Sequence, residues 1–193
     1  MMTADAEVPP EFLRALHALR DHRPRQEVRL TEIPAPARIA PYAVALTGEV
    51  TPPGEDLEEE EPAGGRFVLL HDPAGQEAWE GTFRVVTLVR ATLDPEVAVD
   101  PLLCDAAWTW VEDALVASGL GHHALGGTVT KVQSRSFGAL AERPDEVEVE
   151  IRASWSPSPE DAGAHLAPWT VLLCTAAGLP PLPDGVTSLG RRL

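Results

Sequence analysis

The sequence predicts an α+β protein in which an antiparallel sheet carries helices on one face. Segments typical of strands come in adjacent pairs, at 66–72 with 82–93 and at 126–137 with 145–155. A segment with apolar residues at helical spacing follows each pair, within 101–118 and 158–177 respectively. Strands joined by short connections pair antiparallel, and amphipathic helices pack on the sheet so formed.

The N-terminal part adds a helix and two further strands. Residues 10–21 have the apolar spacing of a short helix, on a stripe formed by Phe12, Leu16 and Leu19. Residues 27–33 predict a weak strand, and the alternation over 42–50 predicts a stronger one near a sheet edge. With the weak strand set aside, the predicted element order is α-β-β-β-α-β-β-α.

The strand at 82–93 carries apolar residues on both faces, which predicts a central and largely covered position. Its Phe83, Val85 and Thr87 share one face with Val89 and Ala91. The next helix is expected to begin with Asp100 as the N-cap and Pro101 at the first helical position. Gly119 is expected to end it in the left-handed conformation.

The second half shows a clear division between core and solvent. In the strand at 145–155, five apolar residues point one way and three glutamates alternate with them: Val147, Val149, Ile151, Ala153, Trp155, and Glu146, Glu148, Glu150. The helix that follows has a start resembling a capping box, from Ser158 to Asp161. Pro168 either kinks this helix or marks its true beginning.

The two halves resemble each other when the chain is shifted by 62 residues. Gly64-Gly65 then aligns with Gly126-Gly127, and Arg90-Ala91 aligns with Arg152-Ala153. We interpret 64–120 and 126–179 as a duplicated ββα unit. Coincidence within a biased composition is the alternative.

The length of 193 residues, with 44% apolar and 23% charged residues, predicts a single domain over 1–193. Residues 51–65 combine carboxylates with prolines and glycines and predict a mobile acidic surface loop. Residues 180–193 predict a loose tail.

The net charge of −15 argues against nucleic acid or a membrane as a partner, because both select basic surfaces. No apolar run has the length of a membrane span, and the acidic N-terminus does not resemble a signal peptide. A cytoplasmic location is therefore expected. There Cys104 and Cys174 would be buried, reduced thiols.

Known catalytic and nucleotide-binding motifs are absent. The sequence lacks the G-x-S-x-G elbow of hydrolases and the glycine-rich phosphate-binding patterns. His122-His123 has no third ligand nearby and predicts a loop, and the acidic run at 51–65 lacks calcium-loop spacing. We therefore predict no catalytic residue, no metal and no cofactor, and leave enzymatic activity open.

One loop gathers several chemically distinct side chains. The hairpin connection within 71–84 contains His71, Asp72, Gln76, Glu77 and Trp79, with Arg84 shortly after. These residues predict a polar cluster able to hold a peptide or a small polar ligand. Alternatively, Asp72-Pro73 and Gly75 simply form a turn over which Trp79 packs.

Four segments carry a resemblance to a known family: HDPAGQEAWEGTFRVVTLVRA, PAPARIAPYA, ALGGTV and LLCTAAGLP. Through them the chain is similar to the actinobacterial domain-of-unknown-function family three thousand, over most of 10–182. This resemblance implies no activity and no catalytic residues. By element order alone the chain resembles the type III secretion chaperone-like fold of YbjN-type proteins, from which the strand at 27–33 departs.

Three functions stay open at this point. The first is a non-enzymatic adaptor or chaperone-like protein that binds another polypeptide, with homodimer formation as a further expectation. The second is a small-molecule-binding protein or minor enzyme that uses the 71–84 hairpin loop. The third is a structural subunit of a larger assembly, which an exposed apolar patch would favour.

Overall fold

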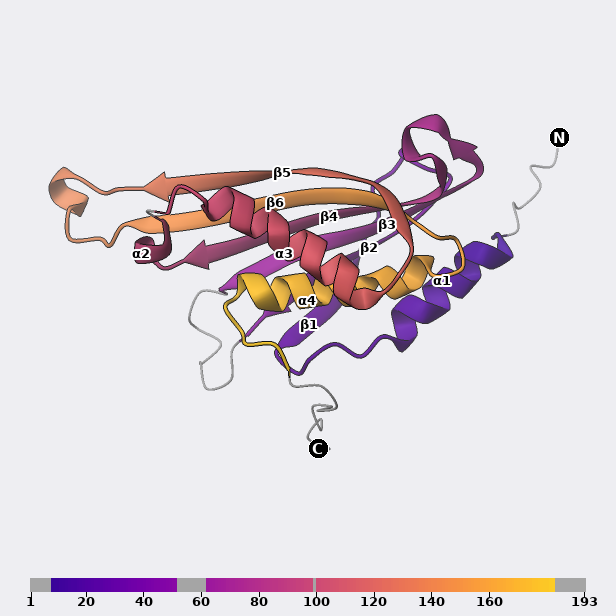
Figure 1. The fold of residues 1–193 in the computed structure, drawn as a ribbon, viewed down its shortest axis with the longest axis horizontal. Helices are drawn as coiled ribbons and strands as arrows, with labels where there is room; N and C mark the ends of the chain where they lie inside the picture. The colour runs from indigo at the N-terminus through magenta and orange to yellow at the C-terminus, as the bar shows by residue number, and fades with distance from the viewer. Residues whose placement is uncertain (1–7, 52–61, 99, 183–193) are drawn as a thin grey trace.

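The fold is a six-stranded antiparallel sheet with helices on one face, as a computed structural model describes it for residues 8–51, 62–98 and 100–182 (Figure 1). The strands lie in the order β1-β2-β3-β4-β6-β5. Their bounds are β1 Val28–Ile33, β2 Tyr42–Val50, β3 Ala63–Gln76, β4 Gly81–Leu93, β5 His122–Ser134 and β6 Glu146–Pro157. The predicted fold class is confirmed, and the weak strand at 27–33 is real and forms one edge of the sheet.

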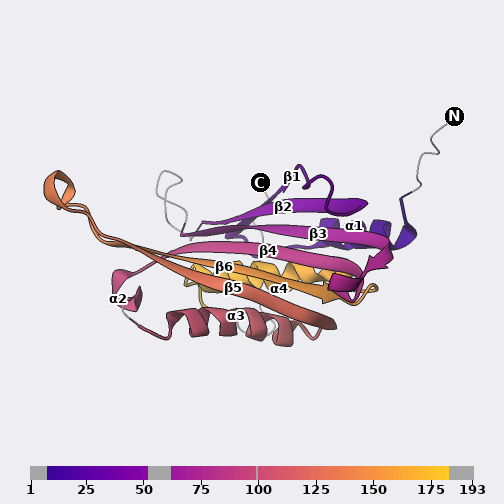
Figure 2. The same ribbon diagram turned by 90° about the horizontal axis from the view of Figure 1, so that it is seen from above.

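The three longer helices cover the same face of the sheet (Figure 2). These are α1 Pro10–Asp21, α3 Leu103–Ser118 and α4 Leu166–Ala176; the fourth, α2 Pro95–Ala98, is a short turn before α3. α3 packs on β5 and β6, whereas α4 packs on β2, β3 and β4. Each of these two helices therefore covers the strands of the other half of the chain.

The main core lies between this helical layer and the sheet. Its largest fully buried side chains include Trp155, Trp169, Phe67, Phe83 and Leu69. The predicted core faces are confirmed, since Phe83, Val85, Thr87, Val89 and Ala91 of β4 are buried together with Val147, Val149, Ile151, Ala153 and Trp155 of β6. Burial of this apolar surface is the main source of stability for such a two-layer arrangement.

Two glycines let the helices approach the sheet closely. A Cβ atom on Gly65 of β3 would lie 2.1 Å from the Leu88 carbonyl oxygen and 3.2 Å from the Leu173 side chain of α4. A Cβ atom on Gly127 of β5 would lie 2.1 Å from the Arg152 carbonyl oxygen and 2.7 Å from the Trp108 ring of α3. Glycine is therefore required at both positions by lack of space.

Two predicted element starts are wrong in detail. α3 begins at Leu103, and Asp100 instead accepts a hydrogen bond from the Leu102 backbone N–H at 2.8 Å, in the turn before the helix. His122 and His123 belong to β5, although the sequence predicted a loop at these two residues. Local sequence signals locate the ends of helices and strands less reliably than the elements themselves.

The start of α4 also differs from the prediction. A 3₁₀ turn, Ala162–His165, leads into α4, and neither segment has a side-chain cap hydrogen bond, so the capping box from Ser158 does not form. Pro168 lies at the third residue of α4 and marks its beginning, where a missing N–H costs nothing. Gly119 ends α3 in the left-handed conformation, with φ of 67°, as predicted.

One face of the sheet stays open, which corrects the prediction that both faces of the strand at 82–93 are covered. Val86 on this open face is 40% exposed. The three longer helices of the described residues all lie on the opposite face (Figure 2). A second, smaller apolar cluster covers only the part of this face near β2 and β3, formed by Ala45, Val68, Leu70 and Trp79.

The predicted acidic loop at 51–65 falls partly on β3, which begins at Ala63, and its residues 52–61 lie outside the described residues. Residues 183–193 of the predicted tail also lie outside them. No helix in the described part of the chain combines the length and the apolarity that crossing a membrane requires.

Candidate functional site

His71 of the predicted site lies inside the core. It is fully buried in β3, and its ring stacks on Phe83 with ring centroids 4.1 Å apart. Its Nδ1 donates to the Thr82 carbonyl oxygen at 3.0 Å. Its Nε2 lies 3.1 Å from Glu11 Oε1 of α1, although the geometry of this contact is not that of a hydrogen bond. His71 thus ties α1 to the sheet.

Asp72, Gln76 and Glu77 lie at the end of the β3–β4 hairpin. Asp72 accepts hydrogen bonds from the Ala74 backbone N–H at 3.0 Å and from Gln76 Nε2 at 3.2 Å. Glu77 is exposed and begins a 3₁₀ turn, Glu77–Trp79. The first two side chains therefore stabilise the turn itself, in the manner of an Asx turn.

Trp79 and Arg84 lie on the open face and are linked through β6. Ser156 of β6 is buried; its hydroxyl donates to the Trp79 carbonyl oxygen and accepts from Arg84 Nη1 at 3.1 Å. Arg84 also donates to the Ala124 carbonyl oxygen at 3.0 Å and to Ser154 Oγ at 2.7 Å. Burial lowers the pKa of Arg84 from its ordinary value. This arginine fastens the hairpin end onto β5 and β6.

The six predicted side chains are thus divided between the two faces of the sheet. His71 faces the helices, Trp79 and Arg84 face the opposite side, and the other three lie at the hairpin end. The described residues do not bring them together around one cavity. The alternative in which the loop forms a turn with Trp79 packed over it agrees with this geometry. Whether these residues bind a ligand stays a prediction.

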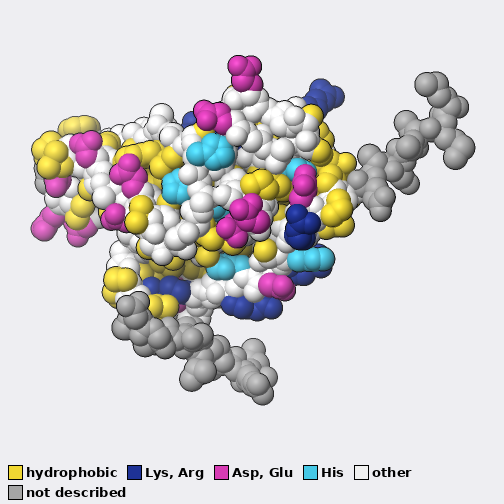
Figure 3. Space-filling model, turned by 45° about the vertical axis from the view of Figure 1, so that its right-hand side comes forward, with side chains coloured by type: hydrophobic (Ala, Val, Ile, Leu, Met, Phe, Trp, Pro, Cys, Tyr) yellow, Lys and Arg dark blue, Asp and Glu magenta, His cyan; other side chains and the backbone are white. Residues whose placement is uncertain are grey.

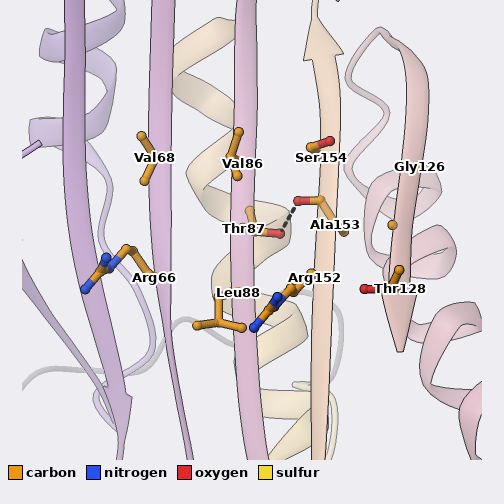
Figure 4. Close-up of a pocket in the computed structure, with 11 residues that line it drawn as sticks. Arg66, Val68, Val86, Thr87, Leu88, Gly126, Thr128, Arg152, Ala153 and Ser154 are labelled. Carbon is orange, nitrogen blue, oxygen red and sulfur yellow. Dashed lines mark hydrogen bonds between the residues drawn. The ribbon is translucent and has the colours of Figure 1, made fainter. Parts of the chain in front are cut away.

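The open face carries a groove, which we call the open-face groove, with a volume of about 540 Å³ (Figure 4). Val68, Val86 and Leu88 form its apolar floor, on β3 and β4. Ser154 of β6 and Gly126 of β5 border it on the other side. In Figure 4, Arg66 and Arg152 lie on either side of Leu88, and the helices lie behind the strands.

The arginines of the open-face groove differ in their partners. Glu150 of β6 binds two arginines at once, with Oε2 2.6 Å from Arg90 Nε and Oε1 2.7 Å from Arg152 Nε. Hydrogen bonding by Arg90, opposed by desolvation and assisted by Arg152, lowers the pKa of the Glu150 carboxyl. Arg66 is exposed and forms no ion pair or side-chain hydrogen bond with any residue that the structure describes.

A second unusual surface is the end of the β5–β6 hairpin, residues 130–146, which we call the arm. It projects past the helical layer (Figure 2), and all of its residues are exposed except Ser136 and Asp145, which are half-buried. Val132, Phe137 and Leu140 expose 49%, 74% and 49% of their surface. In Figure 3, hydrophobic and acidic side chains lie together at this end of the molecule.

Sequence reasoning missed both surfaces, although one signal was present. In β4 the residues Arg84, Val86, Leu88 and Arg90 alternate with the core residues, so they had to share one face. The arm left no local signal, since 134–145 has the composition of an ordinary turn.

Groups typical of metal or thiol chemistry lie apart from these surfaces. Within 8–51, 62–98 and 100–182, no three His, Cys, Asp or Glu side chains gather closely enough to hold a metal ion. Cys104 is half-buried and Cys174 is buried; neither forms a disulfide. Burial raises the pKa of the Cys174 thiol, which keeps it protonated and unreactive.

One protein family matches the chain, described as protein of unknown function (DUF3000), and the match covers residues 8–187. Neither the curated proteins nor the solved structures contain a match.

Proposed function

The chain belongs to the DUF3000 family of proteins of unknown function, and from its geometry we propose that it is a non-enzymatic, protein-binding domain that docks on another polypeptide through its arm. Membership of this family assigns no activity. The observation that carries the proposal is the exposure of Phe137 and Leu140 at the end of a hairpin that projects from the body.

Among the described residues, Phe137 is the one aromatic side chain that is largely exposed. A soluble fold normally packs a phenylalanine, because burying one contributes roughly 2 to 3 kcal/mol. Here Phe137, Leu140 and Val132 lie where neither the helices nor the sheet can cover them. An apolar pocket on a partner would recover this burial, and aromatic anchors of this kind dominate many interfaces.

The charge of the arm supports the same proposal. It contains three basic residues, Lys131, Arg135 and Arg143, and three acidic residues, Glu142, Asp145 and Glu146. Arg135 Nε, just after β5, pairs with Asp145 Oδ2, just before β6, at 3.4 Å, which joins the two sides of the arm. The arm is therefore neutral on a protein of net charge −15, and an acidic partner meets least repulsion there.

We propose that the domain acts in the cytoplasm, as an adaptor or chaperone-like protein. The two free cysteines agree with a reducing compartment. The outer edge of β5 pairs with no other strand of the described residues and runs into the arm, so an extended segment of the partner has backbone groups to bind beside Phe137.

We expect a photo-crosslinking amino acid at position 137 to form a covalent adduct with one partner polypeptide in cells that naturally make the protein. The matched control places the same amino acid at Val116 of α3, which is 76% exposed and lies on the helical face. Gel electrophoresis followed by mass spectrometry identifies the adduct.

The Phe137→Ala, Leu140→Ala double variant should lower recovery of that partner at least tenfold, while Val116→Ala leaves it unchanged. Because all three side chains are exposed, none of these changes should alter the melting temperature by more than a few degrees. Equal adducts at 137 and 116, or none at 137, would contradict the proposal. An adduct of twice the chain mass would assign the arm to homodimer formation instead.

A small-molecule function is the second candidate, and a separate observation favours it. The sequence located it at the 71–84 hairpin, whose side chains share no cavity among the described residues. Of that set, only Arg84 touches Ser154 at the border of the open-face groove. The candidate surface for a small molecule is therefore the open-face groove, which is concave, partly apolar and cationic. It lies on a different part of the molecule from the arm.

A further inference from the structure

We propose that the open-face groove binds a small organic carboxylate, a molecule with a single carboxylate group and a compact apolar body. This inference goes beyond protein binding through the arm and does not depend on it. It comes from three properties of the groove: its floor, its cations and the charge around it.

The floor of the groove recognises the apolar body. Val86, which is 40% exposed, and the half-buried Leu88 present aliphatic side chains to solvent beside the buried Val68. The groove has a volume of about 540 Å³, within the range of small-molecule sites. The border at Gly126 faces open space, since a Cβ atom there would meet nothing within 4 Å. Val68 also belongs to the smaller apolar cluster around Trp79, so the floor of the groove continues into that cluster.

The cations recognise the carboxylate. Arg66 and Arg152 lie on either side of Leu88, and Arg66 has all its donors free of described partners (Figure 4). Arg152 donates from Nε to Glu150 at 2.7 Å, which leaves its terminal nitrogens for a ligand. The planar fork of a guanidinium matches a carboxylate in geometry and gives charge-assisted hydrogen bonds.

Ser154 adds a directed hydroxyl group. Its Oγ accepts a hydrogen bond from Arg84 Nη2 at 2.7 Å, so its own proton is available to an acceptor in the groove. Arg84 in turn is fixed by the Ala124 carbonyl oxygen and by Ser156. The hydroxyl is thus held in place before any ligand arrives, which lowers the entropic cost of binding.

The surrounding charge limits how acidic the ligand can be. Glu148 and Glu150 lie on the same face of β6, and the whole protein carries a net charge of −15. A polyanion such as an acidic peptide or a nucleotide would be repelled by this field. A ligand with a single carboxylate is repelled least by this field and can still bind both arginines.

The test titrates the full-length protein with octanoate and, separately, with octanamide, its neutral counterpart of equal length, by calorimetry. Octanoate is expected to bind at least tenfold more tightly than octanamide. Methyl resonances of Val68, Val86 and Leu88 should shift in NMR spectra during the octanoate titration, whereas those of Val116 on α3 should not.

Arg66→Gln should reduce octanoate affinity at least tenfold and remove the preference over octanamide. The matched control is Arg29→Gln, an exposed arginine of β1 on the same face and outside the groove, which changes the net charge equally. Equal losses in both variants, equal binding of the acid and the amide, or shifts confined to the helical face would each overturn the proposal. Crosslinking at position 137 is unaffected by any of these outcomes, so the two proposals fail independently.

Discussion

Gly127→Ala is expected to lower the free energy of unfolding by about 3 kcal/mol or more, or to abolish a cooperative transition altogether. The added Cβ atom would lie 2.1 Å from the Arg152 carbonyl oxygen and 2.7 Å from the ring of Trp108. A backbone oxygen of the neighbouring strand cannot move without breaking the β5–β6 ladder, and the indole belongs to the helical layer. Equilibrium unfolding in urea, followed by circular dichroism, measures the change.

The neighbouring residue provides a matched control. Gly126 lies in the same strand, and a Cβ atom there would meet nothing within 4 Å, so Gly126→Ala should change stability by less than about 0.5 kcal/mol. Gly65→Ala should resemble Gly127→Ala, since its Cβ atom would lie 2.1 Å from the Leu88 carbonyl oxygen. Similar losses for Gly126→Ala and Gly127→Ala would show that close packing does not explain the glycine at 127.

Acidification should destabilise the fold through His165. This histidine is fully buried in the 3₁₀ turn before α4, and its Nδ1 accepts a hydrogen bond from Trp155 Nε1 at 3.0 Å. Desolvation lowers the pKa of His165 to about 4, with His122 adding to the shift, and Gly121 and Asp161 opposing it. Protonation would also remove the acceptor that the indole N–H uses.

The direction of the effect follows from the two pKa values. The unfolded chain binds a proton near pH 6.5 and the folded chain only near pH 4, so the unfolded state gains protons first as the pH falls. The contribution of His165 to stability is therefore fully present above pH 6.5 and is lost as the pH falls from 6.5 to 4. Between pH 7.5 and pH 5 the loss from this group should be about 2 kcal/mol.

Urea unfolding of the wild type and of His165→Gln at pH 7.5 and pH 5 tests this expectation. The variant should show a smaller loss on acidification by about 2 kcal/mol, even where it is less stable overall. His17→Gln changes an exposed histidine of α1 and should retain the loss seen in the wild type. If His165→Gln and the wild type lose the same stability, another group is responsible.

The sequence predicted the elements and their faces well, because strand alternation records burial directly. β6 alternates five buried apolar residues with glutamates, one arginine and serines, and its register against β4 keeps Val149, Ile151 and Ala153 on the core face. The order of strands in the sheet was not predictable in this way. Nothing local to β4 encodes β6 as its neighbour, since that pairing depends on packing between segments distant in sequence.

The internal repeat stays a prediction, which the strand arrangement supports. Val89 pairs with Ile151, the residue with which the 62-residue shift aligns it. A pseudo-twofold axis through this pair would exchange the two hairpins and also their helices. The placement of α3 on β5 and β6, with α4 on β3 and β4, has this form.

The candidate site was less predictable than the fold, because the prediction grouped residues that are close in the sequence. The face of the sheet on which a strand residue lies depends instead on whether its position is odd or even in the strand. His71 shares its parity with the core residues Leu69 and Phe67, which places it under the helices. Arg84 shares its parity with Val86 on the open face. The open-face groove combines Arg66, Val86 and Ser154 from three strands, and only the assembled sheet brings these together.

The exchange of helices between the two hairpins has a kinetic consequence for a chain being synthesised. β2, β3 and β4 emerge early, but the helix that covers them, α4, begins only at Leu166. Until then the part of their apolar face that α4 covers stays exposed to solvent, although Phe12 of α1 can already pack beside Tyr42 and His71. Partly folded chains with exposed apolar surface are the species that chaperones bind. The domain should therefore fold in one step, and only after α4 has been synthesised. Its folding rate should be low, as is typical of sheets that pair strands distant in sequence.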